Sequence, residues 1–282
     1  MLIDAQVHIW GAPTITRPWP EVHGKPHREI PYGAAEIIAQ MDEAGVDRAV
    51  IVPPSWEGDR NDLAIDAVSE FPGRFGIMGR LSVPDHRSVD FARWRSTPGM
   101  LGLRFTFHRP EMRAWLTDGS AEWIFAGAAT HGLPIMMLAP GQSPAVADVA
   151  RRYGDLTLIV DHLNLPGESG RTEISERIAA LTPLIECENV AIKISALPCY
   201  TDERAPYPEL QLLIRRVVDA FGADRCMWGS DISRLPGNYA DWVNCFREGT
   251  GPLSASEAAK VGGATLARLL HWPAEGMSVP IS

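Results

Sequence analysis

The sequence has no apolar run long enough to cross a membrane, and it does not begin with a basic segment followed by an apolar one. It contains only 4 cysteines, and none of them forms a Cys-x-x-Cys pair. A disulfide framework and a cysteine-rich metal site are therefore not indicated. We expect a soluble, cytoplasmic protein whose thiols are reduced.

Positive charge is also scarce, because 26 Lys and Arg residues face 35 Asp and Glu residues, for a net charge of -9. This balance argues against nucleic acid or an anionic membrane as the main partner. It does not argue against a small anionic ligand, since local arginines bind carboxylates through bidentate contacts whatever the global charge. The sequence leaves the oligomeric state open, a homo-oligomer included.

Strand and helix patterns alternate along the whole chain, at about thirty residues per unit. The expected strands cover residues 3–10, 49–52, 74–81, 100–107, 133–138, 156–162, 189–195 and 225–231. The expected helices cover residues 33–45, 61–71, 86–96, 120–131, 144–153, 174–186, 208–221 and 254–270. We predict a single domain over residues 1–282, folded as an α/β (β/α)8 TIM barrel with its chemistry at the carboxyl ends of the strands.

The opening strand has polar residues at every second position. Strict alternation would place Asp4, Gln6 and His8 on one face and the apolar residues between them on the other. Gln6 and His8 should therefore point the same way at the strand's carboxyl end. The connection that follows, residues 11–32, is rich in Pro, His and Trp, and we expect a flap over the active site with solvated histidines.

Residues at the carboxyl ends of barrel strands converge in space, however far apart they are in sequence. The first expected strand carries Gln6 and His8, the fourth Arg104, the sixth His162 and the eighth Asp231. Two imidazoles and a carboxylate on one rim indicate a catalytic site more strongly than any of them alone. An arginine inside an apolar strand should be paired or functional, because an unpaired buried charge is costly.

The motifs at these four strand ends resemble those of the amidohydrolase superfamily. They are Asp-x-Gln-x-His at residues 4–8, Gly-Leu-Arg-Phe at 102–105, Asp-His at 161–162 and Trp-Gly-Ser-Asp at 228–231. The resemblance extends from residue 3 to residue 270 and is to the lactonase branch, which includes a pyrone-dicarboxylate lactonase, sugar lactonases and a lactone isomerase. It implies that Asp231 is the general base that takes a proton from water. It also implies that His8 and His162 either hold a metal or donate to the substrate carbonyl.

Four further residues are candidates for binding substrate. The resemblance implies that Arg104 and Arg204, the latter on the seventh loop, hold a carboxylate of the substrate. Gln6 lies beside the imidazole of the first strand, and Trp56 follows the second strand in a polar loop. Lys193 on the seventh strand invites a covalent role, but a lysine that faces a barrel layer is expected to pair with an acid.

Gln6 stands where the superfamily usually has the first histidine of a His-x-His pair. An amide oxygen is a far poorer ligand than imidazole for a divalent transition metal. We therefore expect no cofactor. The alternative is one divalent metal such as zinc held by His8, His162 and Asp231.

The sequence thus predicts a hydrolase that opens a carboxylated lactone, from aromatic or sugar-acid catabolism, by general-base activation of water. Three alternatives remain open: a metal-free lactone isomerase, a metal-dependent amidohydrolase or decarboxylase, and a barrel that binds a ligand without turnover. The reaction product distinguishes them. We expect a small anionic cyclic substrate, no nucleic acid and no membrane partner.

Overall fold

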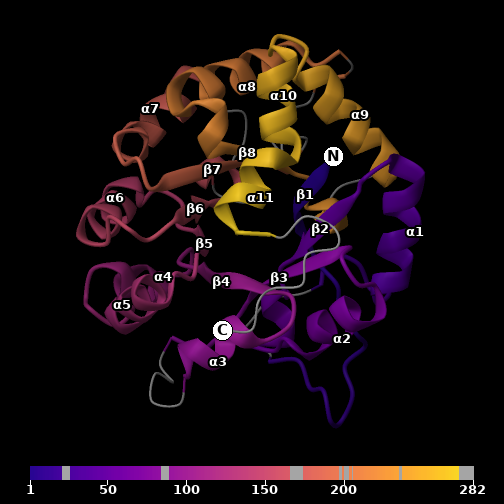
Figure 1. Ribbon diagram of the computed structural model, residues 1–282, viewed down its shortest axis with the longest axis vertical. Coiled ribbons are helices and arrows are strands. Elements are labelled where there is room, and N and C mark those ends of the chain that lie inside the picture. The colour runs from indigo at the N-terminus through magenta and orange to yellow at the C-terminus, as the bar shows by residue number, and fades with distance from the viewer. Residues whose placement is uncertain are drawn as a thin grey trace.

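The computed structural model describes residues 1–20, 26–83, 89–165, 174–196, 199, 203–204, 206–234 and 237–272. A single sheet of eight parallel strands runs in the order β1 to β8, and helices surround it (Figure 1). The predicted TIM barrel is confirmed. Among the described residues, no helix combines the length and apolar character that a membrane span requires.

The strands are β1 (Ile3–Val7), β2 (Arg48–Ile51), β3 (Phe75–Gly79), β4 (Met100–Thr106), β5 (Ile135–Leu138), β6 (Leu158–Val160), β7 (Val190–Ser195) and β8 (Cys226–Gly229). The helices before β7 are α1 (Ala34–Ala44), α2 (Asp62–Glu70), α3 (Phe91–Ser96), α4 (Pro110–Arg113), α5 (Glu122–His131), α6 (Ser143–Arg152) and α7 (Ile174–Ile185). Those after it are α8 (Pro208–Phe221), α9 (Tyr239–Gly249), α10 (Ala255–Ala259) and α11 (Thr265–Leu269).

Helix α9 is absent from the sequence-based prediction, which assigned one helix to each strand. Its first turn is a capping box, in which the Asn238 side chain accepts from the Asp241 backbone N–H and the Asp241 side chain accepts from the Asn238 N–H. Tyr239, Val243 and Phe246 form its buried face. Both the cap and the helical spacing of these apolar residues were readable in the sequence. The predicted capping box at Ser254 and Glu257 is confirmed at the start of α10.

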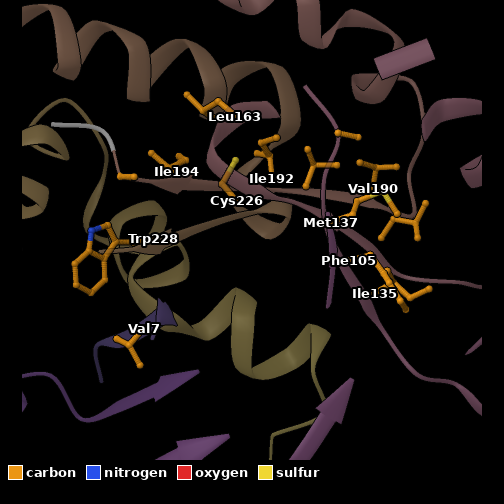
Figure 2. Packing of buried hydrophobic residues seen from close by; sticks show 14 of the residues in the cluster. Val7, Phe105, Ile135, Met137, Leu163, Val190, Ile192, Ile194, Cys226 and Trp228 are labelled. Carbon is orange, nitrogen blue, oxygen red and sulfur yellow. The ribbon is translucent and has the colours of Figure 1, made fainter. Parts of the chain in front are cut away.

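The amino-terminal half of the barrel interior is apolar. One cluster of buried side chains fills it, namely Ile3, Ala5, Val50, Val52, Met78, Met136, Ile159, Ala191 and Met227. Leu266, Leu270 and Trp272 belong to the same cluster, so α11 and the residues after it close this end of the barrel (Figure 1). A second cluster lies between the outer face of the strands and the helices, and includes Phe105, Ile135 and Ile192 (Figure 2).

Strand β1 does not keep the strict alternation predicted from its sequence. Ile3 and Ala5 belong to the interior cluster, whereas Val7 belongs to the outer one. The pairing of β1 with β2 shifts register in the second half of the strand. Such a bulge shifts the alternation of the strand's two faces by one residue. Ala5 faces the interior before the shift, and Gln6 and His8 face it after the shift. Their common direction was predicted correctly, but the expected opposition to Ile3 and Ala5 was wrong.

The junction between β8 and β1 depends on a buried carboxylate. Asp4 Oδ1 accepts from the backbone N–H groups of Gln6 at 2.9 Å and Ser230 at 2.8 Å, and Oδ2 accepts from Tyr239 Oη at 2.5 Å. The Asp231 N–H also donates to the Gln6 carbonyl oxygen at 3.0 Å. Burial raises the pKa of Asp4 to about 6, against the lowering effect of these hydrogen bonds.

Replacing Asp4 tests this junction. Asp4→Ala leaves two buried N–H groups without acceptors, so we expect a loss of about 3 to 5 kcal/mol in unfolding free energy. Asp4→Asn retains an acceptor oxygen and should cost much less. Because the folded pKa exceeds the unfolded one, the carboxyl group's contribution to stability is complete below pH 3.8 and is lost as pH rises through about 6.

Urea unfolding of both variants and the parent between pH 4 and 7 measures these effects. The stability of the parent relative to Asp4→Asn should fall across this range. Equal stabilities of Asp4→Ala and Asp4→Asn would show that the carboxylate does not hold the junction.

Candidate active site

The structure brings together the three residues predicted to be catalytic. His8 Nε2 lies 3.0 Å from Asp231 Oδ1, and His162 Nε2 lies 3.6 Å from Asp231 Oδ2. The three side chains follow the carboxyl ends of β1, β6 and β8, and all are buried. The barrel therefore assembles two imidazoles around one carboxylate, as the convergence of strand ends predicts.

All three residues lie just beyond the strands to which the sequence assigned them, and β1 ends at Val7, before His8. Strand β6 ends at Val160 and β8 at Gly229, and the backbone then turns into the left-handed region, with φ of 50° at His162 and 54° at Asp231. This conformation costs a non-glycine residue about 1–2 kcal/mol. Such strain is typical of functional sites, where it directs a side chain that a regular strand would aim elsewhere.

His8 has polar partners at both ring nitrogens. Its Nδ1 lies 2.6 Å from the Val52 carbonyl oxygen, which can only accept, so Nδ1 carries a proton. Its Nε2 faces the Asp231 carboxylate, which also only accepts when ionised. Burial alone would raise the pKa of Asp231, but His8 first, and then His162 and Arg234, hold it well below its usual range. Asp231 is therefore an ionised carboxylate within hydrogen-bond distance of His8 Nε2.

His162 also has polar partners at both ring nitrogens. Its Nδ1 lies 2.8 Å from Ser195 Oγ, and its Nε2 lies 3.3 Å from Gln6 Nε2. Burial lowers the pKa of His162 to about 4, against the raising effect of Asp231. The ring is therefore neutral near pH 7. Since an amide NH2 group only donates, Nε2 is the acceptor and Nδ1 carries the proton.

A buried polar layer lies under the imidazoles. Lys193, with 0% of its surface exposed, donates from Nζ to Gln6 Oε1 at 2.8 Å and pairs with Asp161 Oδ1 at 2.8 Å. Asp161 Oδ2 lies 2.6 Å from Arg104 Nε, and Arg104 also donates to the Phe105 carbonyl oxygen. The predictions that Lys193 pairs with an acid and that a buried Arg104 is paired are confirmed. A contact between Arg104 and substrate stays a prediction.

Sequence reasoning missed Arg80, which follows β3 and is only 8% exposed. Asn61 clamps its backbone, donating to the Arg80 carbonyl oxygen at 2.9 Å and accepting from its N–H at 2.8 Å. Arg80 Nε lies 3.4 Å from Asp59 Oδ1. Burial, and then the charges of Arg104 and Arg109, lower the pKa of Arg80 to about 10, although Asp59 opposes them. Side chains of a strand alternate between its two faces, and extending this alternation one residue past β3 would have identified Arg80 as a candidate.

The long connection after β1 reaches the site, as expected of a flap. Trp10 and Tyr32 pair across its base through backbone hydrogen bonds of 3.0 and 3.2 Å. His27 Nδ1 lies 2.7 Å from Ser233 Oγ, in the turn after β8. His27 is exposed, as expected of a loop histidine, and its ring also lies beside those of His8 and Trp56. Residues 21–25, which include the loop's other histidine, lie outside the described residues.

Two predicted binding residues have different positions. The ring of Trp56 is 4% exposed, and its centroid lies 6.0 Å from that of His8 and 4.6 Å from that of His27. Trp56 is therefore a wall of the site. Arg204 is exposed in the loop before α8, part of which lies outside the described residues. No hydrogen bond or ion pair joins Arg204 to the catalytic side chains in the described part, so its role stays a prediction.

The donor groups do not fit a divalent metal well. Because Gln6 Oε1 accepts from Lys193, the Gln6 NH2 group faces the imidazoles, with Nε2 lying 3.3 Å from the Nε2 atoms of both His8 and His162. These two ring nitrogens are the atoms that a metal would need as ligands. Within the described ranges, no group of three or more His, Cys, Asp or Glu side chains has an arrangement suited to a metal ion.

The protonation state of His162 can be tested directly. We expect its imidazole to titrate near pH 4, well below the usual 6.5, because burial disfavours the charged ring. A two-dimensional NMR titration of ¹⁵N-histidine protein, with the His162→Gln variant to assign the signal, measures the midpoint. A midpoint near 6.5 would contradict the neutral ring described above.

Comparison with known proteins places this geometry in a family. The Amidohydrolase family model matches residues 3–272. The chain is 29% identical over 251 residues to an L-fucono-1,5-lactonase of Burkholderia ambifaria, covering 85% of this chain and 83% of that protein. It is 25% identical over 247 residues to a 4-sulfomuconolactone hydrolase of Rhizobium radiobacter, covering 81% and 74%.

Solved structures agree with this assignment at the level of the fold. An amidohydrolase from Burkholderia multivorans superposes with a TM-score of 0.78 at 22% identity, covering 97% of this chain and 100% of that one. The match of the family model extends over nearly the whole barrel, including every strand that contributes to the site. The chain belongs to the amidohydrolase family.

Proposed function

We propose that this protein is a lactonase, an enzyme that hydrolyses a cyclic ester carrying a carboxylate. The observation that carries the proposal is the ionised, buried carboxylate of Asp231 between His8 and His162, at the rim of an amidohydrolase barrel. The names of both curated relatives describe enzymes that act on lactones. Their similarity covers more than four-fifths of this chain and supports the same class of reaction here.

Asp231 is the base in the proposed mechanism. It stays ionised at any working pH and so can accept a proton from a water molecule as that water attacks the lactone carbonyl carbon. When the ring C–O bond breaks, the same proton passes from Asp231 to the departing ring oxygen. The product is an open-chain hydroxy acid, which releases a proton to solution at neutral pH.

Negative charge that develops on the carbonyl oxygen needs donors in a water-poor site. His8 Nε2, 3.0 Å from Asp231 Oδ1, is the proposed donor once this carboxylate has taken the proton of the attacking water. A lactone suits this arrangement because its ester is more reactive than an amide, so less transition-state stabilisation has to come from the protein.

The substrate is proposed to be anionic because positive charge gathers on the β3 and β4 side of the rim. Arg80 lies close enough to Arg104 and Arg109 for their charges to lower its pKa, and Asp59 pairs with it only at 3.4 Å. A substrate carboxylate placed there would offset the repulsion between these guanidinium groups. A lactone from aromatic or sugar-acid catabolism has this chemistry.

We propose that the reaction needs no metal. The supporting observation is the Gln6 NH2 group, which faces the imidazole nitrogens that a metal would require. The competing arrangement is one zinc ion held by His8, His162 and Asp231, with Gln6 turned away. We further propose a cytoplasmic location, which the four free cysteines support.

Replacing Asp231 tests the mechanism. Asp231→Asn keeps the shape of the side chain but removes the base, and we expect turnover of carboxylated lactones to fall by at least about 1,000-fold. Proton release from a panel of such lactones, before and after chelator treatment, measures turnover and metal dependence together.

The matched control is Asp66→Asn, on the exposed face of α2, which should retain full activity. Thermal unfolding checks that both variants are folded. Retained turnover in Asp231→Asn would refute the mechanism, chelator-sensitive turnover would refute metal independence, and an isomeric lactone without proton release would identify an isomerase.

Arg80 provides a test of substrate charge. Arg80→Met removes the guanidinium but keeps the apolar stem, so we expect KM for anionic lactones to rise about 10-fold or more, with little change for neutral lactones. Arg151→Met, on the outer surface at α6, is the matched control. Equal losses on both substrate classes would assign Arg80 a structural role instead.

A further inference from the structure

Gln6 is the only side chain described here that contacts both imidazoles and the buried polar layer. Its Nε2 lies 3.3 Å from His8 Nε2 and 3.3 Å from His162 Nε2, while its Oε1 accepts from Lys193 Nζ at 2.8 Å. Gln6 is 1% exposed and Lys193 is 0% exposed. The amide therefore connects the fixed interior of the barrel with the reaction centre.

Lys193 decides which end of this amide faces the reaction centre. An ammonium group has three donors and no acceptor, so the Gln6 atom beside it must be the oxygen. The NH2 group must then point away, toward the imidazoles. Lys193 cannot turn to relieve this constraint, because Asp161 holds it at 2.8 Å and Arg104 holds Asp161 at 2.6 Å. Strands β1, β4 and β7 and the turn after β6 together set the orientation.

The two N–H groups of Gln6 have different partners. His162 Nε2 accepts one of them, because an amide NH2 group only donates, and His162 Nδ1 faces Ser195 Oγ at 2.8 Å. His8 Nε2 lies 3.3 Å from the same amide but closer, at 3.0 Å, to the Asp231 carboxylate, which only accepts when ionised, so the contact with Asp231 competes with the second N–H for this nitrogen. The second N–H is therefore the one that an oxygen atom placed beside the two imidazoles could accept.

We propose that Lys193 is a positioning residue that, through Gln6, presents an amide N–H to the carbonyl oxygen of the bound lactone. Gln6 is then a catalytic residue, because it contacts the reacting oxygen. Its N–H group takes the place that a metal cation would have in a metal-dependent relative. The inference rests on the proposed lactonase function. Loss of one preorganised donor of this kind lowers kcat about 100-fold to 1,000-fold.

A purely structural role for Lys193 makes a different prediction. A lysine that served only the interior would use Asp161 and Gln6 simply as acceptors for its buried ammonium group. Removing Nζ would then lower stability but would leave the catalytic constants and the imidazole tautomers unchanged in protein that folds. Kinetics and spectroscopy on folded protein therefore separate the two roles.

The first variant is Gln6→Glu, which preserves the length and shape of the side chain and its contact with Lys193. It replaces the NH2 group by an acceptor oxygen, so we expect kcat to fall about 100-fold with a smaller change in KM. We also expect the His162 proton to move from Nδ1 to Nε2, where it can be donated to the new carboxylate. ¹⁵N chemical shifts of the imidazole nitrogens measure the tautomer without substrate.

The second variant is Lys193→Met, which removes the ammonium and keeps the apolar stem. It frees the Gln6 amide to rotate, so we expect mixed His162 tautomers and a kcat lowered about 10-fold or more. Lys260→Met is the matched control, because this exposed lysine pairs with Asp224 on the surface. It should change neither kcat nor the His162 signals.

The outcomes separate this inference from the proposed function. Lactone hydrolysis with unchanged kcat or unchanged His162 tautomers in Gln6→Glu would overturn the inference and leave the lactonase intact. The expected tautomers in a protein that hydrolyses no lactone would instead overturn the proposed function, because the NMR measurement needs no substrate. If Lys193→Met fails to fold, Gln6→Glu decides alone, since it keeps the Lys193 contact.

Discussion

A buried ammonium group has to find acceptors, and this constraint organises the centre of the barrel. Lys193 is fully buried and finds two acceptors, a carboxylate oxygen of Asp161 and the amide oxygen of Gln6. Leaving such a charge unpaired in the interior would cost several kcal/mol. The positions of Asp161 and Gln6 follow from that need, and the direction of the Gln6 NH2 group follows from the position of its oxygen.

The barrel interior consequently has three levels with different physical roles. The lowest is apolar and closed by α11, so it contributes stability through burial. Above it, paired charges lock the side chains on which the site rests. At the rim, backbone segments in the left-handed conformation carry His162 and Asp231. Rigid support of this kind holds catalytic groups in position before substrate arrives.

The first strand connects these levels and also closes the barrel. Asp4 ties it to the turn after β8 and to α9, and a bulge then directs Gln6 and His8 into the site. The Asp231 N–H donates to the Gln6 carbonyl oxygen across the same junction. The geometry of Asp231 and that of the Gln6 amide therefore depend on one short segment, in which Asp4 and Gln6 are two residues apart.

Several features of this protein follow from its sequence alone. Alternating strand and helix patterns determine a parallel barrel, because helices must cover the outer face of every buried strand. The same pattern places His8, His162 and Asp231 on one rim, since the strand ends of a barrel converge. The need to pair a buried charge also predicted partners for Lys193 and Arg104, although it could not name them.

The rest was decided by tertiary structure. Periodicity does not encode contacts between residues far apart in sequence. Three features depend on such contacts: the bulge in β1, the left-handed turn at His162 and the approach of His27 to His8. Arg80 owes its importance to neighbours on another strand. The amide direction of Gln6 depends on Lys193, 187 positions away, because only the packed barrel brings the two side chains together. Sequence thus determined which groups meet at the rim, and the packed barrel decided how each one is oriented and protonated.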